Sequence, residues 1–174
     1  MSTVRIVRPN ELDAVWALVQ RAAAHMREQG NPQWDENYPF ISHFAEGIAA
    51  GDLFAACADD GAILGVLQIN TWYEPCYDDL TGWQETPPVL ALHKMAVDPA
   101  AQRRGIGSAL FAHALSMARE QGLRSIRVDT YTLNTPMREL IAKFGFYPVG
   151  EVFFPDRPLP YIVYEKPISD QTAR

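Results

Sequence analysis

The sequence predicts one α/β domain over residues 1–174, and three observations support this prediction. The chain has 174 residues, of which 48% are hydrophobic, and this suits one domain with a sizeable core. Short apolar runs typical of strands alternate with segments in which apolar residues recur at helical spacing. A pair of glycines lies where one apolar run gives way to a helical segment.

The N-terminal part predicts a strand followed by two helices. Residues 3–8 alternate in polarity and end at Pro9, which predicts the first strand. Asn10 can cap the helix that follows, and Gly30 can end it. Residues 40–51 carry apolar side chains on one helical face and predict the second helix.

Two apolar runs and a long irregular segment come next. Residues 53–58 and 63–72 flank a turn that contains Asp60-Gly61, and this pattern predicts a hairpin. Residues 72–88 are rich in aromatic residues, acids and turn formers, so we expect a long excursion from the sheet, which in a compact domain is usually functional or mobile. Residues 90–97 predict the central strand.

The C-terminal part predicts two helices and three strands. The first helix begins at Ile106 and is stopped by Gly122. The other elements are a strand at 126–131, a short helix at 136–144 and two closing strands at 147–154 and 161–166. We expect residues 169–174 to form a loose tail.

The segment from residue 102 to residue 108, Gln-Arg-Arg-Gly-Ile-Gly-Ser, predicts a phosphate-binding loop. It lies between a strand and a helix, where free backbone N–H groups and the positive end of the helix dipole converge. Its two arginines add positive charge. It lacks the Lys of the Walker pattern after Gly107, and Leu110 stands where the dinucleotide pattern has its third glycine. Taken alone, the segment could also be a plain tight turn.

Composition narrows the classes of partner. A net charge of −6 disfavours a bulk electrostatic role on nucleic acid or on an acidic membrane surface. The two cysteines, Cys57 and Cys76, provide neither a disulfide framework nor a metal-ligand spacing. We recognise no signal peptide and no segment that could span a membrane, so we expect a cytoplasmic protein.

The loop and a second motif together resemble the Gcn5-related N-acetyltransferases, the GNAT superfamily. The first motif is the strand end Met95-Ala96-Val97, followed by Gln102-x-x-Gly105-x-Gly107. The second is Asn134, a short helix and the pair Gly145-Phe146, at the spacing of the family. The resemblance is strong over the C-terminal half. It implies a GNAT-like mixed, mostly antiparallel central sheet of about six to seven strands, splayed at the middle, with helices on both faces.

The resemblance also implies an activity, which is acetyl-CoA-dependent N-acetylation of a primary amine on a small molecule or peptide. Acetyl-CoA would be the co-substrate, and no metal is implied. Because many members dimerise, the resemblance implies a homodimer. The positions that match the cofactor-binding residues of the family are Met95, Ala96, Val97, Gln102, Arg103, Arg104, Gly105, Ile106, Gly107, Ser108 and Asn134.

The resemblance leaves the acid catalyst open. Many members carry a Tyr seven positions after the Asn, and that Tyr protonates the leaving thiolate. In this sequence Ile141 stands at that position. Tyr131 or Tyr147 could replace it, although either residue could simply pack with its hydroxyl at the surface.

Two residues are candidates for the base, which is needed because an ammonium group is not a nucleophile. His93 precedes Met95 by two residues, where some amine-acetylating members carry a His. Asp129 precedes Asn134 by five residues, where the ribosomal-protein alanine acetyltransferases carry a catalytic Glu. The structural alternatives are a hydrogen-bonded strand His and an Asp paired with a nearby Arg.

Aromatic residues provide candidates for acceptor binding, namely Trp34, Tyr38, Tyr73 and Trp83. Neighbouring acids could attract a cationic amine. Core packing or a dimer interface is the alternative role for such rings. Because the usual Tyr is missing, a catalytically weak or inactive acetyl-CoA-binding sensor or assembly module is the rival function. An ATP-binding protein is a third alternative, but the Walker Lys is missing.

Overall fold

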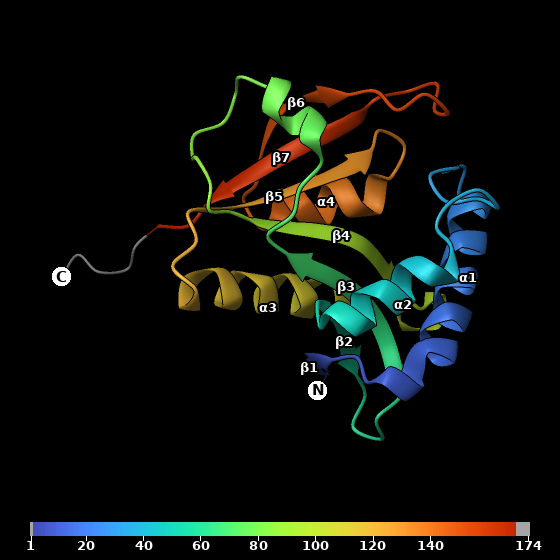
Figure 1. Cartoon of the computed structure of the whole chain (residues 1–174). Coiled ribbons are helices and arrows are strands. Elements are labelled where there is room, and N and C mark those ends of the chain that lie inside the picture. Colours follow the sequence, from blue (N-terminus) through green and yellow to red (C-terminus); the bar gives the residue numbers. More distant parts are fainter. Residues whose placement is uncertain (1, 170–174) are drawn as a thin grey trace. The chain divides into compact units, whose positions relative to one another are not determined.

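The computed structural model describes residues 2–169, which form two compact units (Figure 1). The first unit contains the residues up to Ile69 together with His93–Ala112. The second contains Asn70–Leu92 and the residues from His113 onward. Most of the predicted tail, residues 170–174, lies outside the described residues. The prediction of a single domain over residues 1–174 stays a prediction.

The predicted helices and strands are all present, and most differ from their predicted ends by one or two residues. The strands are β1 (Thr3–Ile6), β2 (Leu53–Cys57), β3 (Ile63–Asn70), β4 (Leu90–Val97), β5 (Ser125–Tyr131), β6 (Tyr147–Val152) and β7 (Tyr161–Pro167). The helices are α1 (Leu12–Glu28), α2 (Ile41–Ala50), α3 (Ile106–Glu120) and α4 (Thr135–Lys143). Three short 3-10 turns are η1 (Pro9–Glu11), η2 (Pro75–Asp79) and η3 (Pro99–Ala101).

The seven strands form one sheet in the order β1-β2-β3-β4-β5-β7-β6. The pairs β1–β2, β2–β3, β5–β7 and β6–β7 are antiparallel, whereas β4–β5 is parallel. The parallel ladder begins with Leu90 opposite Ile126 and ends with Leu92 opposite Val128, although both strands continue. This early end of pairing is what a splayed sheet requires. The predicted mixed, mostly antiparallel sheet is confirmed.

The core of the first unit is mainly aliphatic. Helix α1 places Val15, Leu18 and Val19 in this core, at the helical spacing that predicted the helix, and α2 adds Phe44. The two helices pack against each other, and α2 also packs against β2 (Figure 1). Each of these large apolar side chains contributes about 1.5–3 kcal/mol when it is fully buried.

The start of α1 differs from the prediction. Asn10 lies inside η1 instead of capping the long helix. The neighbouring Glu11 is the residue that ties down this end, because its carboxylate accepts a hydrogen bond from the backbone N–H of Arg8 at 2.8 Å. The same carboxylate pairs with the Arg5 guanidinium at 2.7 Å, and this pair lowers the pKa of Glu11 to about 2. Pairing with Arg5, six residues earlier on β1, thus accompanies the use of Glu11 instead of Asn10 at this end.

The excursion, which we define as residues 71–89 between β3 and β4, is a packed part of the second unit. Its η2 turn buries Tyr77 against Val152 of β6 and Val163 of β7. Gly82 approaches β6 so closely that an added Cβ would lie 2.6 Å from the carbonyl oxygen of Val149. The excursion is therefore fixed to the sheet over these residues.

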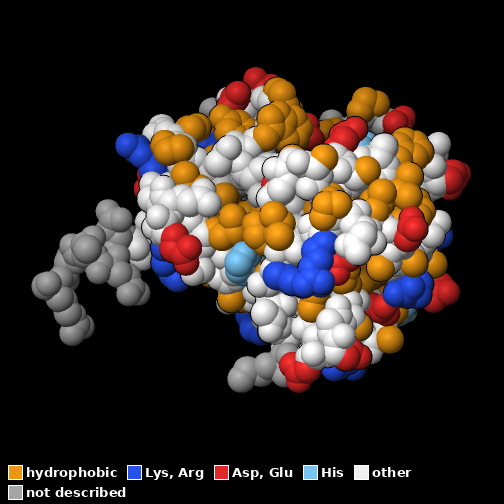
Figure 2. Space-filling model, turned by 60° about the horizontal axis from the view of Figure 1, so that its bottom comes forward, with side chains coloured by type: hydrophobic (Ala, Val, Ile, Leu, Met, Phe, Trp, Pro, Cys, Tyr) orange, Lys and Arg blue, Asp and Glu red, His pale blue; other side chains and the backbone are white. Residues whose placement is uncertain are grey.

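The surface carries mixed charge. Figure 2 shows acidic, basic and hydrophobic side chains interspersed over the face that it displays. Among residues 2–169, no helix is both long enough and apolar enough to cross a lipid bilayer.

Candidate active site

The predicted phosphate-binding loop, residues 102–108, has a backbone that alternates in handedness. Arg103 has φ 60° and Gly105 has φ 78°, both in the left-handed region. The N–H of Ala109 donates to the carbonyl oxygen of Gly105 at 2.9 Å, so α3 begins directly at this turn. The N–H groups in the first turn of a helix have no acceptor within the helix. The loop therefore combines early helical amides with the exposed side chains of Arg103 and Arg104.

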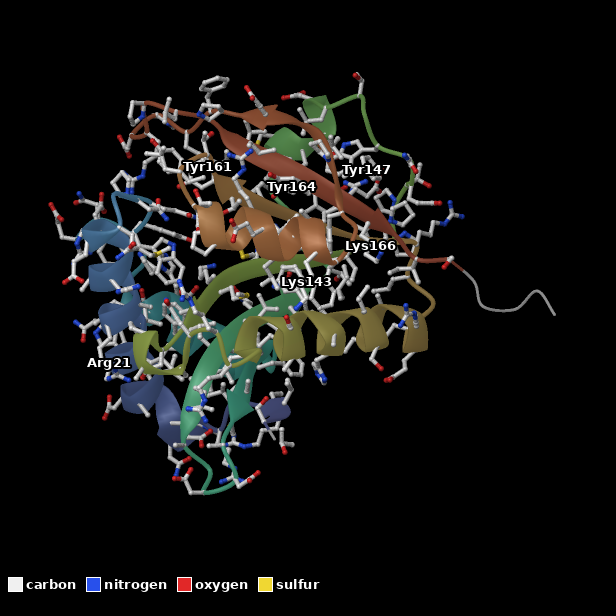
Figure 3. All side chains as sticks on the ribbon, turned by 180° about the vertical axis from the view of Figure 1, so that it is seen from behind. Arg21, Lys143, Tyr147, Tyr161, Tyr164 and Lys166 are labelled. Carbon is white, nitrogen blue, oxygen red and sulfur yellow. The ribbon has the colours of Figure 1, made fainter. Side chains whose placement is uncertain are left out.

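The segment before the loop is held by a salt bridge. Asp98 follows β4, and its carboxylate accepts a hydrogen bond from the backbone N–H of Ala100 at 3.0 Å. The same carboxylate pairs with the Arg21 guanidinium of α1 at 2.5 Å (Figure 3 labels Arg21). Helix α1 thereby fixes the η3 turn that leads into the loop, within the first unit.

Gly65 of β3 also determines where the loop lies. A Cβ at this position would meet the Ile106 Cγ2 atom at 2.7 Å and the carbonyl oxygen of Ala96 at 3.1 Å. Only a glycine lets β3 approach the first residue of α3 so closely. The sequence analysis did not single out this residue, although a glycine inside a strand is a recognisable signal of close backbone approach.

Strand β4 carries the candidate base His93 and the predicted cofactor residues Met95, Ala96 and Val97. Lys94, between them, has φ 49°, which interrupts the regular extended backbone. Its ammonium donates to the Gln68 Oε1 atom at 3.1 Å. Ala96 is buried, whereas His93, Met95 and Val97 are half-buried. The irregular backbone at Lys94 lies just before the end of the strand. The resemblance to the family places the cofactor contacts at that strand end.

Asn134 caps α4 in the second unit. Its side-chain oxygen accepts a hydrogen bond from the N–H of Met137 at 3.3 Å, and its own N–H donates to the carbonyl oxygen of Tyr131 at 2.9 Å. These bonds fix its orientation between β5 and α4. The predicted contact with the cofactor arm stays a prediction.

Asp129 is the candidate base on β5, and its partner is a residue that sequence analysis missed. The hydroxyl of Tyr77 donates a hydrogen bond to the Oδ2 atom of Asp129. Burial, followed by the charge of Asp129, raises the pKa of Tyr77 well above its ordinary value. Pairing of Asp129 with Arg127 or Arg124, the structural alternative, stays a prediction. Arg124 donates to the Thr86 hydroxyl at 2.9 Å, and Arg127 donates to the carbonyl oxygen of Glu85 at 3.1 Å.

The tyrosines considered for the acid are placed differently. Tyr131 is fully buried, with its ring centroid 5.2 Å from that of Tyr161. The hydroxyl of Tyr147 donates to the buried carboxylate of Glu165, and burial together with this bond raises the pKa of Tyr147 to about 12. Figure 3 marks Tyr147 and Tyr161 on the second unit. Ile141, at the position of the missing Tyr, is completely buried. Its aliphatic side chain has no proton to donate.

The four predicted acceptor residues have different environments. Trp34 is only 3% exposed and belongs to the core of the first unit, and its predicted contact with the acceptor stays a prediction. Tyr38 is 38% exposed, and its ring is tilted by 47° against that of His43, with ring centroids 5.3 Å apart. Tyr73 and Trp83 enclose an internal cation, since the Arg127 guanidinium lies 4.7 Å and 3.8 Å from their ring centroids.

Two structural features of the candidate site were therefore missed by sequence reasoning, namely the Tyr77–Asp129 pair and the cation held by Tyr73 and Trp83. The only signal for either was the density of aromatic residues in the excursion. Alternation of side chains along a strand places Arg127 and Asp129, two residues apart, on one face of β5. It could not say which residues of the excursion would cover that face. Among the described residues, no group of three His, Cys, Asp or Glu side chains is arranged to hold a metal ion.

Curated relatives share part of this sequence. A mycothiol acetyltransferase from Sanguibacter keddieii is 30% identical over 145 residues, which are 83% of this chain and 43% of the relative. YwnH from Bacillus subtilis, named as a candidate phosphinothricin acetyltransferase, is 24% identical over 83% of each chain. The chain spans less than half the length of the mycothiol acetyltransferases that it matches.

Solved structures share the fold. An acetyltransferase of the GNAT family from Streptococcus agalactiae has a TM-score of 0.82, with 22% identity over 95% of each chain. The acetyltransferase yncA from Salmonella typhimurium, solved with its cofactor acetyl-CoA, has a TM-score of 0.72 and 14% identity over 100% of this chain and 98% of that one. The family model described as acetyltransferase (GNAT) family matches residues 16–146. Because that match covers most of the sequence, the chain belongs to the GNAT family of acetyltransferases.

Proposed function

We propose that the protein is an acetyl-CoA-dependent N-acetyltransferase that acts on the primary amine of a small molecule or peptide. The observation that carries this proposal is the loop at residues 102–108, where Arg103 and Gly105 adopt left-handed backbone at the start of α3. A diphosphate fits this arrangement, because early helical amides and two arginines supply donors and positive charge. Family membership and the acetyl-CoA in the yncA structure support the same donor.

The reaction replaces a C–S bond with a C–N bond. The acceptor enters as an ammonium and must lose one proton before its nitrogen lone pair can attack the thioester carbonyl carbon. The nitrogen loses a second proton when the amide forms, and the departing thiolate takes up one proton to become the thiol. The net products are the acetylated amine, CoA and one proton.

This chain's residues have proposed roles in the proton steps. We assign the removal of the ammonium proton to Asp129 or His93, directly or through a water molecule. Ile141 cannot donate a proton. The thiolate needs little help to leave, because the ordinary pKa of its thiol is only ~8.5. We propose Tyr131 as the acid that protonates the leaving thiolate. The proposed cofactor contacts are Met95, Ala96, Val97, Gln102, Arg103, Arg104, Gly105, Ile106, Gly107, Ser108 and Asn134.

The names of the relatives point to small molecules as acceptors, because two classes of relative are named for mycothiol and phosphinothricin. We propose that Tyr38, Tyr73 and Trp83 contribute to acceptor binding, with Tyr73 and Trp83 acting through the faces and edges that Arg127 does not cover. We also propose the cytoplasm as the compartment and a homodimer as the assembly.

The loop can be tested with two ligands that differ in the diphosphate. Calorimetric titration should show that the protein binds acetyl-CoA more tightly than acetyl-pantetheine, which lacks the nucleotide and the diphosphate. Replacing Arg103 and Arg104 by Ala should reduce the ratio of the affinities for acetyl-CoA and acetyl-pantetheine about tenfold. A charge-assisted hydrogen bond contributes roughly 1.5–3 kcal/mol, and solvent exposure lowers this value. Arg119→Ala removes one positive charge near the end of α3 and should leave the preference unchanged.

The same titration decides between the candidate functions. Binding of acetyl-CoA followed by turnover on a panel of amines supports the enzyme. Tight binding without turnover would favour the sensor or assembly module. An equal affinity for acetyl-CoA and acetyl-pantetheine would show that loop 102–108 does not bind the diphosphate, and binding of ATP alone would overturn the acetyl-CoA proposal.

A further inference from the structure

We infer that Tyr77 is a positioning residue for acetyl transfer, because its hydroxyl orients the Asp129 carboxylate as the group that takes a proton from the acceptor amine. This inference rests on the proposed function and makes a choice within it, since it favours Asp129 over His93. It also assigns a role to the excursion, which the resemblance did not provide.

The geometry places the hydroxyl of Tyr77 on one specific carboxylate oxygen. Tyr77 lies in η2 and is 3% exposed, and its hydroxyl donates to the Oδ2 atom of Asp129. Asp129 itself is half-buried on β5. A carboxylate has a second oxygen, Oδ1, which can accept a proton while Oδ2 is held by the phenol. The hydrogen bond from Tyr77 therefore fixes the orientation of a carboxylate that retains proton-accepting capacity.

The ring of Tyr77 is held on several sides. It stacks on Tyr73 with an interplanar angle of 11° and a centroid distance of 6.1 Å, and it lies 5.8 Å from Trp83. The indole N–H of Trp83 donates to the backbone carbonyl oxygen of Tyr77 at 2.9 Å. The next residue, Gln84, donates its backbone N–H to the buried Glu165 carboxylate at 2.8 Å. The hydroxyl is thus delivered from a rigid support, which is what a positioning residue requires.

Neighbouring phenol and thiol groups stay protonated at neutral pH. Burial raises the pKa of Tyr77, of Tyr161 on β7 and of Cys76 in η2. The charge of Asp129 contributes to each of these shifts. With its pKa raised, Tyr77 remains a hydrogen-bond donor at neutral pH.

Two charged side chains act on the same cluster from other segments. Arg157, on the connection between β6 and β7, hydrogen-bonds to Tyr161 and opposes the rise of its pKa. Glu74, at the start of η2, adds negative charge beside Tyr77 and Cys76. Because both remain in a Tyr77→Phe variant, a change in that variant reports on the hydroxyl of Tyr77.

Removing the hydroxyl should move the titration of Asp129. A hydrogen bond donated to a carboxylate favours the ionised form and lowers its pKa. Tyr77→Phe should therefore raise the pKa of Asp129 by about one unit, so the acid limb of kcat/KM should move to higher pH by the same amount. At a pH below both midpoints, kcat/KM should fall about tenfold, while the affinity for acetyl-CoA stays unchanged.

Tyr73→Phe is the matched control. Tyr73 belongs to the same aromatic stack, but its hydroxyl donates to Asp78 at 3.2 Å instead of to Asp129. Because Tyr73 is itself a proposed acceptor-binding residue, the comparison uses only the midpoint of the acid limb and not the size of kcat/KM. That midpoint should be the same in Tyr73→Phe and in the wild type. Carbon-13 NMR of protein labelled at aspartate carboxyls supplies a readout that does not need turnover, and Asp129→Asn assigns the signal. The Asp129 signal should titrate at higher pH in Tyr77→Phe than in the wild type or in Tyr73→Phe.

The outcomes separate this inference from the proposed function. If the wild type acetylates an amine but Tyr77→Phe moves neither the acid limb nor the Asp129 signal, the inference is wrong and the proposed function stands. An equal shift in Tyr73→Phe would assign the effect to the stack and would also overturn the inference. If the wild type binds acetyl-CoA but acetylates no amine, the proposed function fails and the inference fails with it.

Discussion

Single charged residues in this protein are held by partners that the fold brings from elsewhere in the chain. Glu11 joins η1 to β1 through the Arg5 guanidinium. Asp98 joins the η3 turn, which leads into the loop at residues 102–108, to α1 through Arg21. Arg127 lies between two aromatic rings of the excursion. Burying each of these charged groups without its partner costs free energy. Removing the partner or the charge should therefore lower the free energy of unfolding.

Glu11 provides a pH-dependent test at this scale. Its pKa is lowered from 4.5 to about 2, first by the hydrogen bond from Arg5. Its contribution to stability is therefore complete above about pH 4.5 and is lost as the pH falls toward 2. Glu11→Gln should lower the free energy of unfolding by roughly 1–2 kcal/mol at neutral pH, a value reduced for partial exposure of the pair.

Urea denaturation of Glu11→Gln and wild type at several pH values measures this effect. The difference in the free energy of unfolding should shrink as the pH approaches 2, because the wild-type carboxyl is then protonated as well. Asp13→Asn removes an exposed acid from the first turn of α1 and should cost only a few tenths of a kcal/mol. A difference that is equal at neutral and acid pH would contradict the ion-pair explanation.

At the scale of elements, the excursion depends on one buried acid of β7. Glu165 is fully buried and accepts hydrogen bonds from the Ser125 hydroxyl at 2.8 Å, from the Gln84 N–H at 2.8 Å and from the Tyr147 hydroxyl. Three donors on three different segments thus converge on one carboxylate. They join β5, β6 and the excursion to β7 within the second unit.

Glu165→Gln should loosen this junction. The amide keeps one acceptor oxygen but presents an N–H₂ group to donors that need an acceptor, which leaves a buried hydrogen bond unmade at a cost of about 1–3 kcal/mol. The Gln84 amide should then exchange its hydrogen faster, as measured by hydrogen–deuterium exchange. Glu151→Gln changes an exposed acid on β6 and should leave that exchange rate unchanged. Equal protection of Gln84 in all three proteins would contradict the role given to Glu165.

Local patterns in the sequence predicted the elements well but not the contacts between them. Gly30 and Gly122, both with positive φ, follow α1 and α3 as the glycine signals indicated. The loop at residues 102–108 was predicted for the same reason, since its chemistry is written in adjacent residues. Tyr77 and Asp129 are 52 positions apart, and Gln84 and Glu165 are 81 apart. Spacing within one element carries no information about such pairs, and it does not distinguish a buried indole such as Trp34 from an exposed one.

For the whole molecule, acetyl-CoA should act as a stabilising ligand. A ligand that binds only the folded state raises the free energy of unfolding by about 2.7 kcal/mol at one hundred times its Kd. For a chain of this size that corresponds to a rise in Tm of roughly 5–10 °C. Differential scanning fluorimetry with acetyl-CoA, and with ATP at the same concentration as the control, measures it. An equal rise with ATP would mean that the nucleotide, not the acetylated arm, is recognised.

The contact between Gly65 and Ile106 makes these two positions genetically interdependent. Because an added methyl at residue 65 would meet the Ile106 side chain at 2.7 Å, bulk gained at one position must be given up at the other. Random mutagenesis should therefore recover changes at residue 65 mainly as pairs, with a smaller side chain at residue 106. The carbonyl oxygen of Ala96, at 3.1 Å, cannot be trimmed by mutation, so compensation stays incomplete. Gly65 thus limits how far the start of α3 can shift during evolution.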